Sequence, residues 1–149
     1  CIEVLEDILK ERKISNVLDV GCGTGVLAIC ATALGADTAL AIDVDPVAVE
    51  EARINVKKNG FSNIQIVYDS IKSVRDEFDL VLANLGTVEI LNMSEELKSK
   101  LKRDGLLLIS GIWLTGQKEQ VINRFKELGL SLDRESSAGG WIALLFKMS

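Results

Sequence analysis

The chain has 149 residues, 48% of them hydrophobic, and a formal net charge of -5. This length suits one ordinary domain, and the hydrophobic content allows a sizeable core and argues against disorder. The acidic balance without a run of Lys or Arg argues against direct binding of nucleic acid, and the absence of histidine excludes His-based catalysis and His metal sites, so we expect no metal.

The first expected element is an amphipathic helix over residues 2–12. Its apolar positions follow helical spacing: Ile2, Leu5, Ile8 and Leu9. An apolar run at residues 16–20 predicts the first strand, and a glycine-rich turn leads into a second helix from about Thr24 to Leu34. That helix is apolar almost all round, which suits burial against a sheet, and Gly35 is well placed to end it.

The second expected strand covers residues 38–42 and ends at Asp43. Asp45 is expected to cap the helix that follows, and Pro46 to occupy its first turn. Gly60 is expected to end that helix. The chain thus repeats the order of a strand followed by a helix.

The rest of the chain continues this alternation. Strands are predicted over residues 63–67, 78–83, 105–112, 130–134 and 141–146. Residues 90–103 are expected to be mostly helical with a break near residues 92–94, and another helix is expected to end at Gly129. The loop at residues 136–140 is short, so the last two strands are expected to form an antiparallel hairpin. The pattern predicts an α/β fold with a mostly parallel, seven-stranded sheet.

The strand, the glycine turn and the helix start around residues 17–25 together predict a nucleotide site. Glycines permit positive φ and close approach of a ligand, and a helix start offers free N–H groups. The dinucleotide fingerprint places its last glycine three positions after the second. Here Gly21, Gly23 and Gly25 are evenly spaced, and Val26 occupies the position of that last glycine.

Asp19 lies two residues before Gly21, which places it close enough to face a ligand at the turn. A carboxylate there would repel a pyrophosphate but attract an ammonium group. S-adenosylmethionine carries an ammonium and a sulfonium and no phosphate. The pattern D-x-G-x-G-x-G therefore resembles motif I of the class I methyltransferases, and the alternative is an ordinary tight turn between a strand and a helix.

Asp43 follows Gly21 by 22 residues, near the offset of roughly 20 residues expected for an acid that binds ribose hydroxyls. Its alternative role is a solvated acid at the end of a strand, which the glycine turn makes the weaker interpretation. Asp45 is best interpreted as a helix cap, although a helper role at the ribose edge stays open.

Polar residues also follow two later strands, at the edge where open α/β sheets bind ligands. Asp69 is predicted either to accept a hydrogen bond from an adenine amino group or to cap the turn at Ser70. Asn84 is interpreted as a functional residue rather than a turn residue, because it ends an apolar strand at the crevice. Trp113, after the fifth strand, either packs or forms a wall of a substrate pocket.

The cysteines Cys1, Cys22 and Cys30 show no C-x-x-C spacing, which is typical of a reduced, cytoplasmic protein. Cys22 is expected to fill space in the turn rather than act as a nucleophile, because no base is near it in sequence. The sequence shows no signal peptide and no apolar run of membrane-spanning length, so no membrane partner is expected.

Five stretches of the chain, taken in order, carry a resemblance to a known family. They read VLDVGCGTGVLAI (17–29), AIDVDPVAV (41–49), VLANL (81–85), LISGI (108–112) and WIAL (141–144). Together they resemble the bacterial ribosomal protein L11 methyltransferase family. The first stretch is common to many methyltransferases, and the ordered set is considerably more specific.

The resemblance implies a Rossmann-like class I methyltransferase fold with helices on both faces of the sheet. It implies S-adenosylmethionine as cofactor, a lysine of a ribosomal protein as substrate, and methyl transfer to an amino group. Asn84 is expected to contact the cofactor and to orient the amine, and no dedicated base is expected. The full set of expected cofactor-binding residues is Asp19, Gly21, Gly23, Gly25, Asp43, Asp69 and Asn84.

The resemblance also has two departures. The family has a separate N-terminal domain that captures the ribosomal protein, and a threonine-rich cofactor loop just before Cys1; we expect both to be missing and residues 1–149 to form one methyltransferase domain. The alternatives are a methyltransferase for a small molecule or another protein and a non-catalytic cofactor-binding domain. A nicotinamide-dependent oxidoreductase is disfavoured by Val26 and Asp19.

Overall fold

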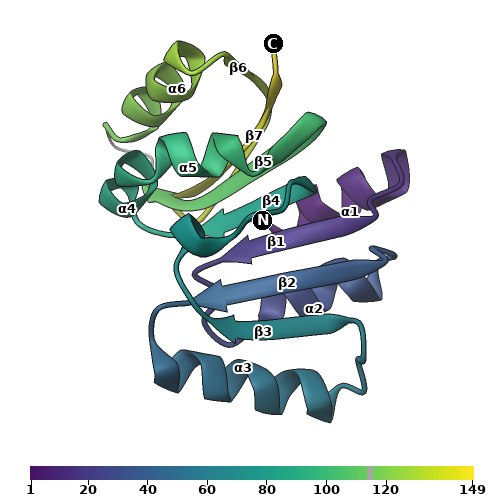
Figure 1. Cartoon of the computed structure of the whole chain (residues 1–149). Helices are drawn as coiled ribbons and strands as arrows, with labels where there is room; N and C mark the ends of the chain where they lie inside the picture. Colours follow the sequence, from purple (N-terminus) through teal and green to yellow (C-terminus); the bar gives the residue numbers. More distant parts are fainter. Residues whose placement is uncertain (114–115) are drawn as a thin grey trace.

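Seven strands form a single sheet in the order β3-β2-β1-β4-β5-β7-β6 in the computed structural model, which describes residues 1–113 and 116–149 (Figure 1). The strands are β1 (Asn16–Val20), β2 (Thr38–Asp43), β3 (Ile64–Tyr68), β4 (Phe78–Asn84), β5 (Leu101–Trp113), β6 (Leu130–Ala138) and β7 (Trp141–Met148). Strands β1 to β5 pair in parallel, and β7 runs antiparallel to both β5 and β6. The predicted fold class, including the C-terminal hairpin, is confirmed.

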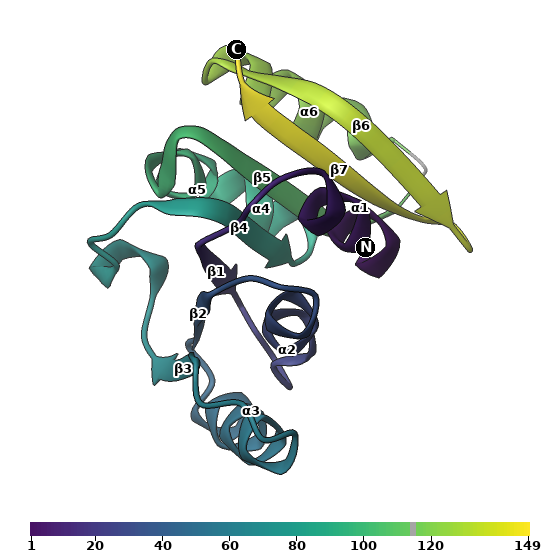
Figure 2. The same cartoon turned by 90° about the vertical axis from the view of Figure 1, so that its right-hand side faces the viewer.

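Helices cover both faces of this sheet (Figures 1 and 2). The helices are α1 (Ile2–Glu11), α2 (Val26–Ala33), α3 (Pro46–Lys58), the 3-10 helix η1 (Ile71–Ser73), α4 (Thr87–Asn92), α5 (Ser94–Ser99) and α6 (Lys118–Glu127). Helices α1 to α3 lie against one face, and α4 to α6 lie against the other. None of the helices in the described residues is long and apolar enough to cross a membrane.

Two hydrophobic cores follow from this arrangement, one on each face of the sheet. Because successive side chains of a strand point to opposite faces, residues two positions apart share a face. Leu82 of β4 and Leu108 of β5 pack in the core under α1 to α3. Asn84 and Ser110, each two positions later, therefore fall on this same face of the sheet.

The helix predicted to reach residue 103 is wrong at its end, because α5 stops at Ser99 and β5 begins at Leu101. Leu101 is buried and pairs with Phe78, and the pairing then shifts to Leu80 with Leu106, so the intervening residues bulge. Burial of an apolar side chain against a neighbouring strand thus overrides the helical pattern of this segment. The predicted helix break is confirmed at Met93, between α4 and α5.

The last two strands are longer than predicted. β6 continues to Ala138, so the connecting loop is Gly139–Gly140 rather than residues 136–140. Both glycines have positive φ, at 58° and 86°, which is the conformation that a two-residue hairpin turn of type I′ needs. Helix α2 likewise starts at Val26 instead of Thr24, because Gly25 before it has a φ of 81°.

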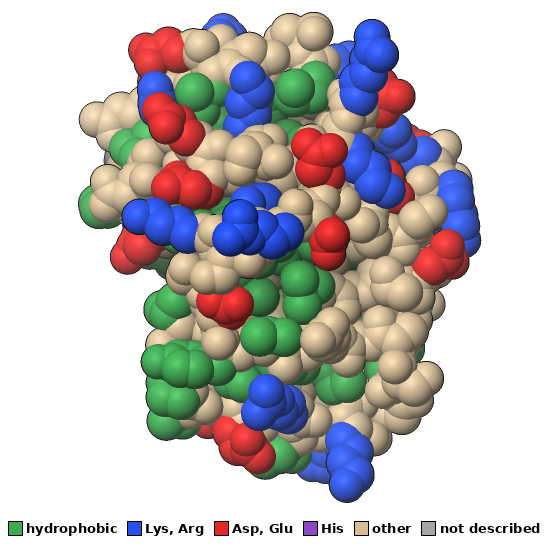
Figure 3. All heavy atoms as spheres, in the orientation of Figure 1, with side chains coloured by type: hydrophobic (Ala, Val, Ile, Leu, Met, Phe, Trp, Pro, Cys, Tyr) green, Lys and Arg blue, Asp and Glu red, His purple; other side chains and the backbone are tan. Residues whose placement is uncertain are grey.

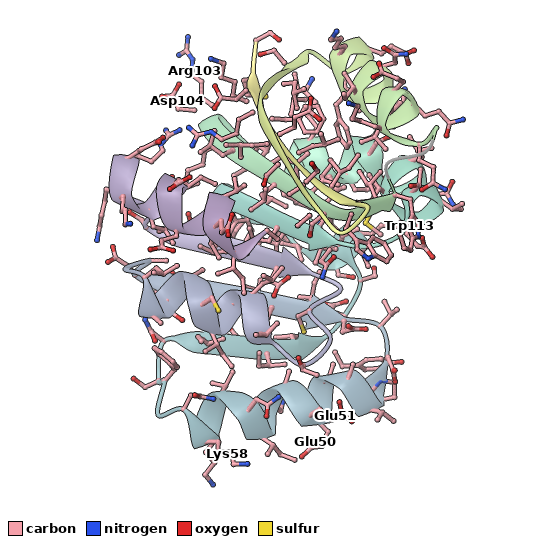
Figure 4. The ribbon with its side chains drawn as sticks, turned by 180° about the vertical axis from the view of Figure 1, so that it is seen from behind. Glu50, Glu51, Lys58, Arg103, Asp104 and Trp113 are labelled. Carbon is pink, nitrogen blue, oxygen red and sulfur yellow. The ribbon has the colours of Figure 1, made fainter. Side chains whose placement is uncertain are left out.

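Charged side chains are spread unevenly on the face shown in Figure 3. Basic and acidic groups are interspersed over the upper half, whereas hydrophobic side chains gather over the lower half, where β2 and β3 lie. On the opposite face, Figure 4 shows Glu50, Glu51 and Lys58 along α3, with Arg103 and Asp104 at one end of β5 and Trp113 at the other. The two ends of β5 therefore lie on opposite edges of the sheet, and the Trp113 edge carries the predicted site.

Candidate functional site

The glycine turn lies at the carboxyl ends of the parallel strands, directly after β1. Gly21, Gly23 and Gly25 have φ values of 68°, 54° and 81°, whereas positive φ does not occur at any non-glycine residue that the structure describes. A Cβ on Gly21 would lie 2.6 Å from Cδ2 of Leu85, and a Cβ on Gly25 would lie 3.3 Å from Cβ of Ala52. Gly21 and Gly25 are thus needed for close approach as well as for their backbone conformation, and Gly23 for conformation alone.

Asp43 holds this turn to the end of β2. Its Oδ2 accepts a hydrogen bond from the backbone N–H of Gly23 at 2.9 Å, and its Oδ1 accepts one from the N–H of Asp45, also at 2.9 Å. Asp45 in turn caps α3 by accepting from the N–H of Val47 at 3.0 Å, as predicted. The strand-end acid is therefore a structural link between two loops of the site, besides lining a pocket.

One pocket, of about 440 Å³, lies on the β2 side of the turn and is called here the β2-side pocket. Its lining includes Gly21, Asp43, Asp69, Ile71 and Leu85. Three of the predicted cofactor residues, one glycine and two acids, are thus brought together. Apolar walls with carboxylates at the rim suit a flat heterocycle joined to a polyhydroxylated sugar.

Asp69 in this pocket is engaged locally, because its Oδ1 accepts a hydrogen bond from the N–H of Ser70 at 2.8 Å. The second carboxylate oxygen has further acceptor capacity toward the pocket. Both roles predicted for Asp69, a local cap and an adenine contact, are compatible with this geometry, so the adenine contact stays a prediction.

A second pocket, of about 650 Å³, lies on the other side of the turn and is called here the β5-side pocket. Its lining includes Val26 at the start of α2, Asn84, Ser110, Gly111 and Trp141. The turn from Gly21 to Val26 therefore lies between two pockets and contributes residues to both. Asn84 lies in a different pocket from Asp43 and Asp69.

Asp19 lies beneath the turn and lines neither pocket, so the structure does not place it facing a ligand as predicted. Its side chain is only 1% exposed, and its Oδ2 has no hydrogen-bond partner among the described residues. Burial raises the pKa of this carboxyl to about 7, the N–H of Ala28 opposes the shift, and the charge of Asp43 adds to it. Asp19 is buried under the turn because α2 packs over the end of β1. Its carboxyl group therefore changes its charge near neutral pH.

The other turn residues lie as follows. Gly23 and Gly25 form the turn without lining either pocket. Cys22 is buried, and desolvation, reinforced by Asp19 and Asp43, raises its pKa to about 12. A neutral thiol is a poor nucleophile, so the side chain fills space, as expected from the sequence.

Asn84 is the predicted site residue that lines the β5-side pocket; the rest of its lining was not predicted as part of the site, including Ser110 and Gly111 beside Asn84. Gly111 has a φ of 92° and lies at a shift in pairing between β5 and β7. A Cβ there would lie 2.8 Å from the carbonyl oxygen of Leu85 and 3.0 Å from Oδ1 of Asn84. A glycine inside an apolar strand is the available signal, because it often marks a bulge or a close backbone approach.

Trp113 stacks on Trp141 with ring centroids 3.7 Å apart and an interplanar angle of 33°. The two side chains are 47% and 46% exposed, and Trp141 lines the β5-side pocket. Packing, one of the two roles considered for Trp113, is therefore confirmed, and the pair forms an aromatic rim beside that pocket.

A further pocket, of about 380 Å³, lies at the opposite edge of the sheet, near Arg103 and Asp104 (Figure 4). Its walls carry a paired interaction between Arg134 and Glu11, in which Nη2 and Oε2 are 2.8 Å apart. This ion pair links the end of α1 to β6, at the edge of the sheet opposite the one where open α/β sheets bind ligands. The described residues contain no cluster of three or more metal-ligating side chains.

Comparison with known proteins identifies the family. The family model described as ribosomal protein L11 methyltransferase (PrmA) matches residues 1–149. A protein named ribosomal protein L11 methyltransferase from Thermoanaerobacter pseudethanolicus is 38% identical over 146 residues, which are 97% of this chain and 46% of that protein. One of the same name from Clostridium botulinum strain Eklund 17B is 36% identical over 149 residues, 99% of this chain and 47% of the relative.

Solved structures agree with this match. The ribosomal protein L11 methylase from Lactobacillus delbrueckii subsp. bulgaricus is similar with a TM-score of 0.92 at 30% identity, covering 99% of this chain and 77% of that one. The N-methyltransferase NodS from Bradyrhizobium japonicum WM9, in complex with S-adenosyl-L-homocysteine, shares the fold with a TM-score of 0.76 at 18% identity, over 99% and 83% of the two chains.

The chain spans about half the length of the curated relatives it matches. Within that span the match is continuous, because the family model covers all 149 residues and the solved relative superimposes over 99% of the chain. The glycine turn and the strand-end residues that carried the resemblance lie together at one edge of the sheet. The chain belongs to the ribosomal protein L11 methyltransferase (PrmA) family.

Proposed function

We propose that this domain binds S-adenosylmethionine and catalyses transfer of its methyl group to amino groups of ribosomal protein L11. The observation that carries the proposal is the pair of pockets on either side of the glycine turn. Acids line one pocket and Asn84 lines the other. One ligand that crosses the turn would place a nucleoside in the first pocket and a reactive group beside Asn84 in the second.

The residues present fit such a ligand. Gly21 lines the β2-side pocket with backbone alone, and the Leu85 side chain packs where a side chain of residue 21 would lie, so a ligand can approach the turn closely. Asp43 is expected to bind the ribose hydroxyls with the acceptor capacity that its two backbone contacts leave, and Asp69 to accept from the adenine amino group. The start of α2 at Val26 offers free N–H groups to a carboxylate.

The chemistry that the cofactor supplies when bound is a methyl group activated by a positively charged sulfur. The chain's own contribution is to hold an amine near that methyl group, because positioning is the main source of rate in such a displacement. Asn84 is expected to orient the amine through its side-chain oxygen. Partial removal of the lysine side chain from water disfavours its charged form and so helps the amine to become neutral.

Two observations support ribosomal protein L11 as the proposed substrate: the names of the relatives and the negative charge of this domain. The relatives are named for ribosomal protein L11, and the present domain is acidic, with a formal net charge of -5. Glu3 lines the β5-side pocket and Glu89 lines the β2-side pocket, so carboxylates flank both openings. A basic protein segment would be attracted to this edge of the sheet.

Calorimetric titration tests the cofactor. We expect S-adenosylmethionine and its demethylated product, S-adenosylhomocysteine, to bind and NAD to bind weakly or not at all. The reason is that Val26 occupies the position of the last glycine of the dinucleotide fingerprint, so the turn lacks the spacing that accommodates a pyrophosphate. Tighter binding of NAD than of S-adenosylhomocysteine would overturn the proposal, whereas cofactor binding without methyl transfer to L11 would point to another substrate.

Asp43→Ala is expected to weaken binding of S-adenosylhomocysteine by roughly 1.5–3 kcal/mol, the scale of hydrogen bonds to a charged group. The fold is expected to survive, because Asp43 lies at a strand end and outside both hydrophobic cores. Affinity is measured by calorimetry and folding by thermal melting.

Asp45→Ala is the matched control, because it also removes an acceptor for a backbone N–H at this edge but lines neither pocket. We expect it to lower stability by about 1 kcal/mol, the usual value of a helix cap, with little effect on affinity. An equal loss of affinity in both variants would show that the loss comes from disturbing the connection between β2 and α3, which both acids stabilise, and not from a contact with the ribose.

A further inference from the structure

Trp113 lies against the tip of the β6–β7 hairpin (Figure 4). It is the last residue of β5 and pairs with Trp141, the first residue of β7, and Trp141 pairs in turn with Ala138 at the end of β6. The two indole rings stack with their centroids 3.7 Å apart. A row of three paired residues therefore crosses from β5 to the outermost strand of the sheet, directly beside the hairpin turn.

The ring of Trp113 also contacts the turn itself. A Cβ on Gly140 would lie 3.1 Å from Cζ3 and 3.4 Å from Cε3 of Trp113, whereas a Cβ on Gly139 would meet nothing within 4 Å. The absence of a side chain at Gly140 is thus what allows the ring to lie on the backbone of the turn. A turn of two glycines is conformationally permissive and β6 is an edge strand, so this contact from β5 limits the positions that the tip can take.

The tip of the hairpin forms one wall of the β5-side pocket. Four residues of the hairpin line this pocket: Ser136, Ser137, Ala138 and Trp141. Trp113 is not among the described residues of the lining, so any effect that it has on a ligand in the pocket acts through the hairpin. A half-exposed tryptophan adds little to a hydrophobic core, and its placement here is accounted for by the wall that it holds.

We propose that Trp113 is a positioning residue for the protein substrate, because it holds the hairpin where residues 136–141 form a ready-made wall of the β5-side pocket. This inference rests on the proposed function, in which a segment of the substrate enters this pocket. A preformed wall spares the substrate the entropic cost of ordering the hairpin. Loss of Trp113 therefore weakens substrate binding, whereas residues proposed to bind the cofactor, such as Asp43, lie outside the hairpin.

Steady-state methylation of L11 gives the first measurement. We expect Trp113→Ala to raise KM for L11 by roughly five- to ten-fold, the scale of one aromatic pair, and to change kcat by less than about two-fold, because the wall acts in binding. Trp113→Phe keeps an aromatic ring beside Trp141 and is expected to restore KM to within about three-fold of the wild-type value. Affinity for S-adenosylhomocysteine, measured by calorimetry, should stay within about two-fold in both variants.

Gly140→Ala tests the same contact without a change at Trp113. The added Cβ displaces the ring from the turn, so we expect KM for L11 to rise by about as much as in Trp113→Ala. Gly139→Ala is the matched control, because both glycines belong to the turn and have positive φ, at 58° and 86°, but the space beside Gly139 is open. We expect Gly139→Ala to leave KM within about two-fold of the wild-type value.

Two further readouts do not depend on turnover. Trp113 and Trp141 are the two tryptophans of the chain, so the exciton coupling of stacked indoles in circular dichroism reports on this site alone. We expect the coupling to vanish in Trp113→Phe, to weaken in Gly140→Ala and to persist in Gly139→Ala. Backbone amides of residues 136–141 should exchange with deuterium roughly ten-fold faster in Trp113→Ala than in the wild-type protein.

An unchanged KM for L11 in both Trp113→Ala and Gly140→Ala would overturn the inference. So would an equal rise in Gly139→Ala and Gly140→Ala, which would assign the effect to the conformation of the turn and not to its contact with Trp113. A wild-type protein that binds S-adenosylhomocysteine but does not methylate L11 would overturn the proposed function, and the inference with it. The two failures are distinguishable, because methylation of L11 by the wild-type protein tests the proposed function alone.

Discussion

Gly111→Ala is expected to lower the free energy of unfolding by roughly 3–5 kcal/mol, from strained backbone and a steric clash together. Gly111 has a φ of 92°, which side chains with a Cβ rarely adopt, and the added Cβ would lie 2.8 Å from the carbonyl oxygen of Leu85. A backbone oxygen cannot move away as the end of a flexible side chain can. Denaturant unfolding followed by circular dichroism measures the loss.

Gly129→Ala separates the two causes. Gly129 ends α6 with a φ of 89°, nearly that of Gly111, but a Cβ there would meet nothing nearer than Nζ of Lys98 at 3.8 Å. This variant should therefore lose only the conformational part, roughly 1–2 kcal/mol. Losses of equal size in the two variants would show that the steric clash with Leu85 does not contribute to the loss of stability in Gly111→Ala.

The order of the elements and the location of the site could be predicted because local signals agree with the fold. Alternating apolar strands and helices predict a parallel sheet, and a parallel sheet brings the ends of successive strands to one edge. Gly21, Asp43 and Asn84 therefore had to lie on the same edge once their strands were recognised. The sequence did not indicate that Asn84 lies in a different pocket from Asp43, because this depends on how the turn runs between them.

The wrong boundaries have a common physical cause. Leu101 and residues 135–138 were not predicted as strand, because pairing with a neighbouring strand, and not local propensity, decides their conformation. The same holds for the site. Ser110 is buried between β4 and β7, its neighbours in the sheet, and no local sequence pattern indicates that its hydroxyl lacks a hydrogen-bond partner among the described residues.

For Asp19, the spacing in the sequence predicts its position at the turn but not its burial. Its distance of two residues from Gly21 places it at the turn, as expected. Whether the carboxylate faces a ligand or the protein interior depends on α2, whose Leu27 and Ala28 are buried. The structure places the carboxyl group under the turn, where its ionisation affects the stability of the folded protein.

The stability of the protein is therefore expected to fall as the pH rises from about 4 to 7 through the titration of Asp19. The pKa of this carboxyl rises from an ordinary value of 3.8 to about 7 in the folded state, mainly because burial disfavours the charged form. Between these values the folded protein holds a proton that the unfolded chain has lost, so raising the pH favours unfolding. The stabilising contribution is fully present below about pH 4 and is lost above about pH 7.

Asp19→Asn isolates this effect, because an amide of nearly the same size has no charge to bury. The free energy of unfolding of each protein is measured by denaturant titration between pH 4 and 8, and the carboxylates that do not interact with Asp19 cancel in the difference. The wild-type protein should lose up to roughly 4 kcal/mol relative to the variant over this interval, the equivalent of about three pH units. A difference that stays constant with pH would show that Asp19 is ionised in the folded protein throughout, held by contacts stronger than its burial.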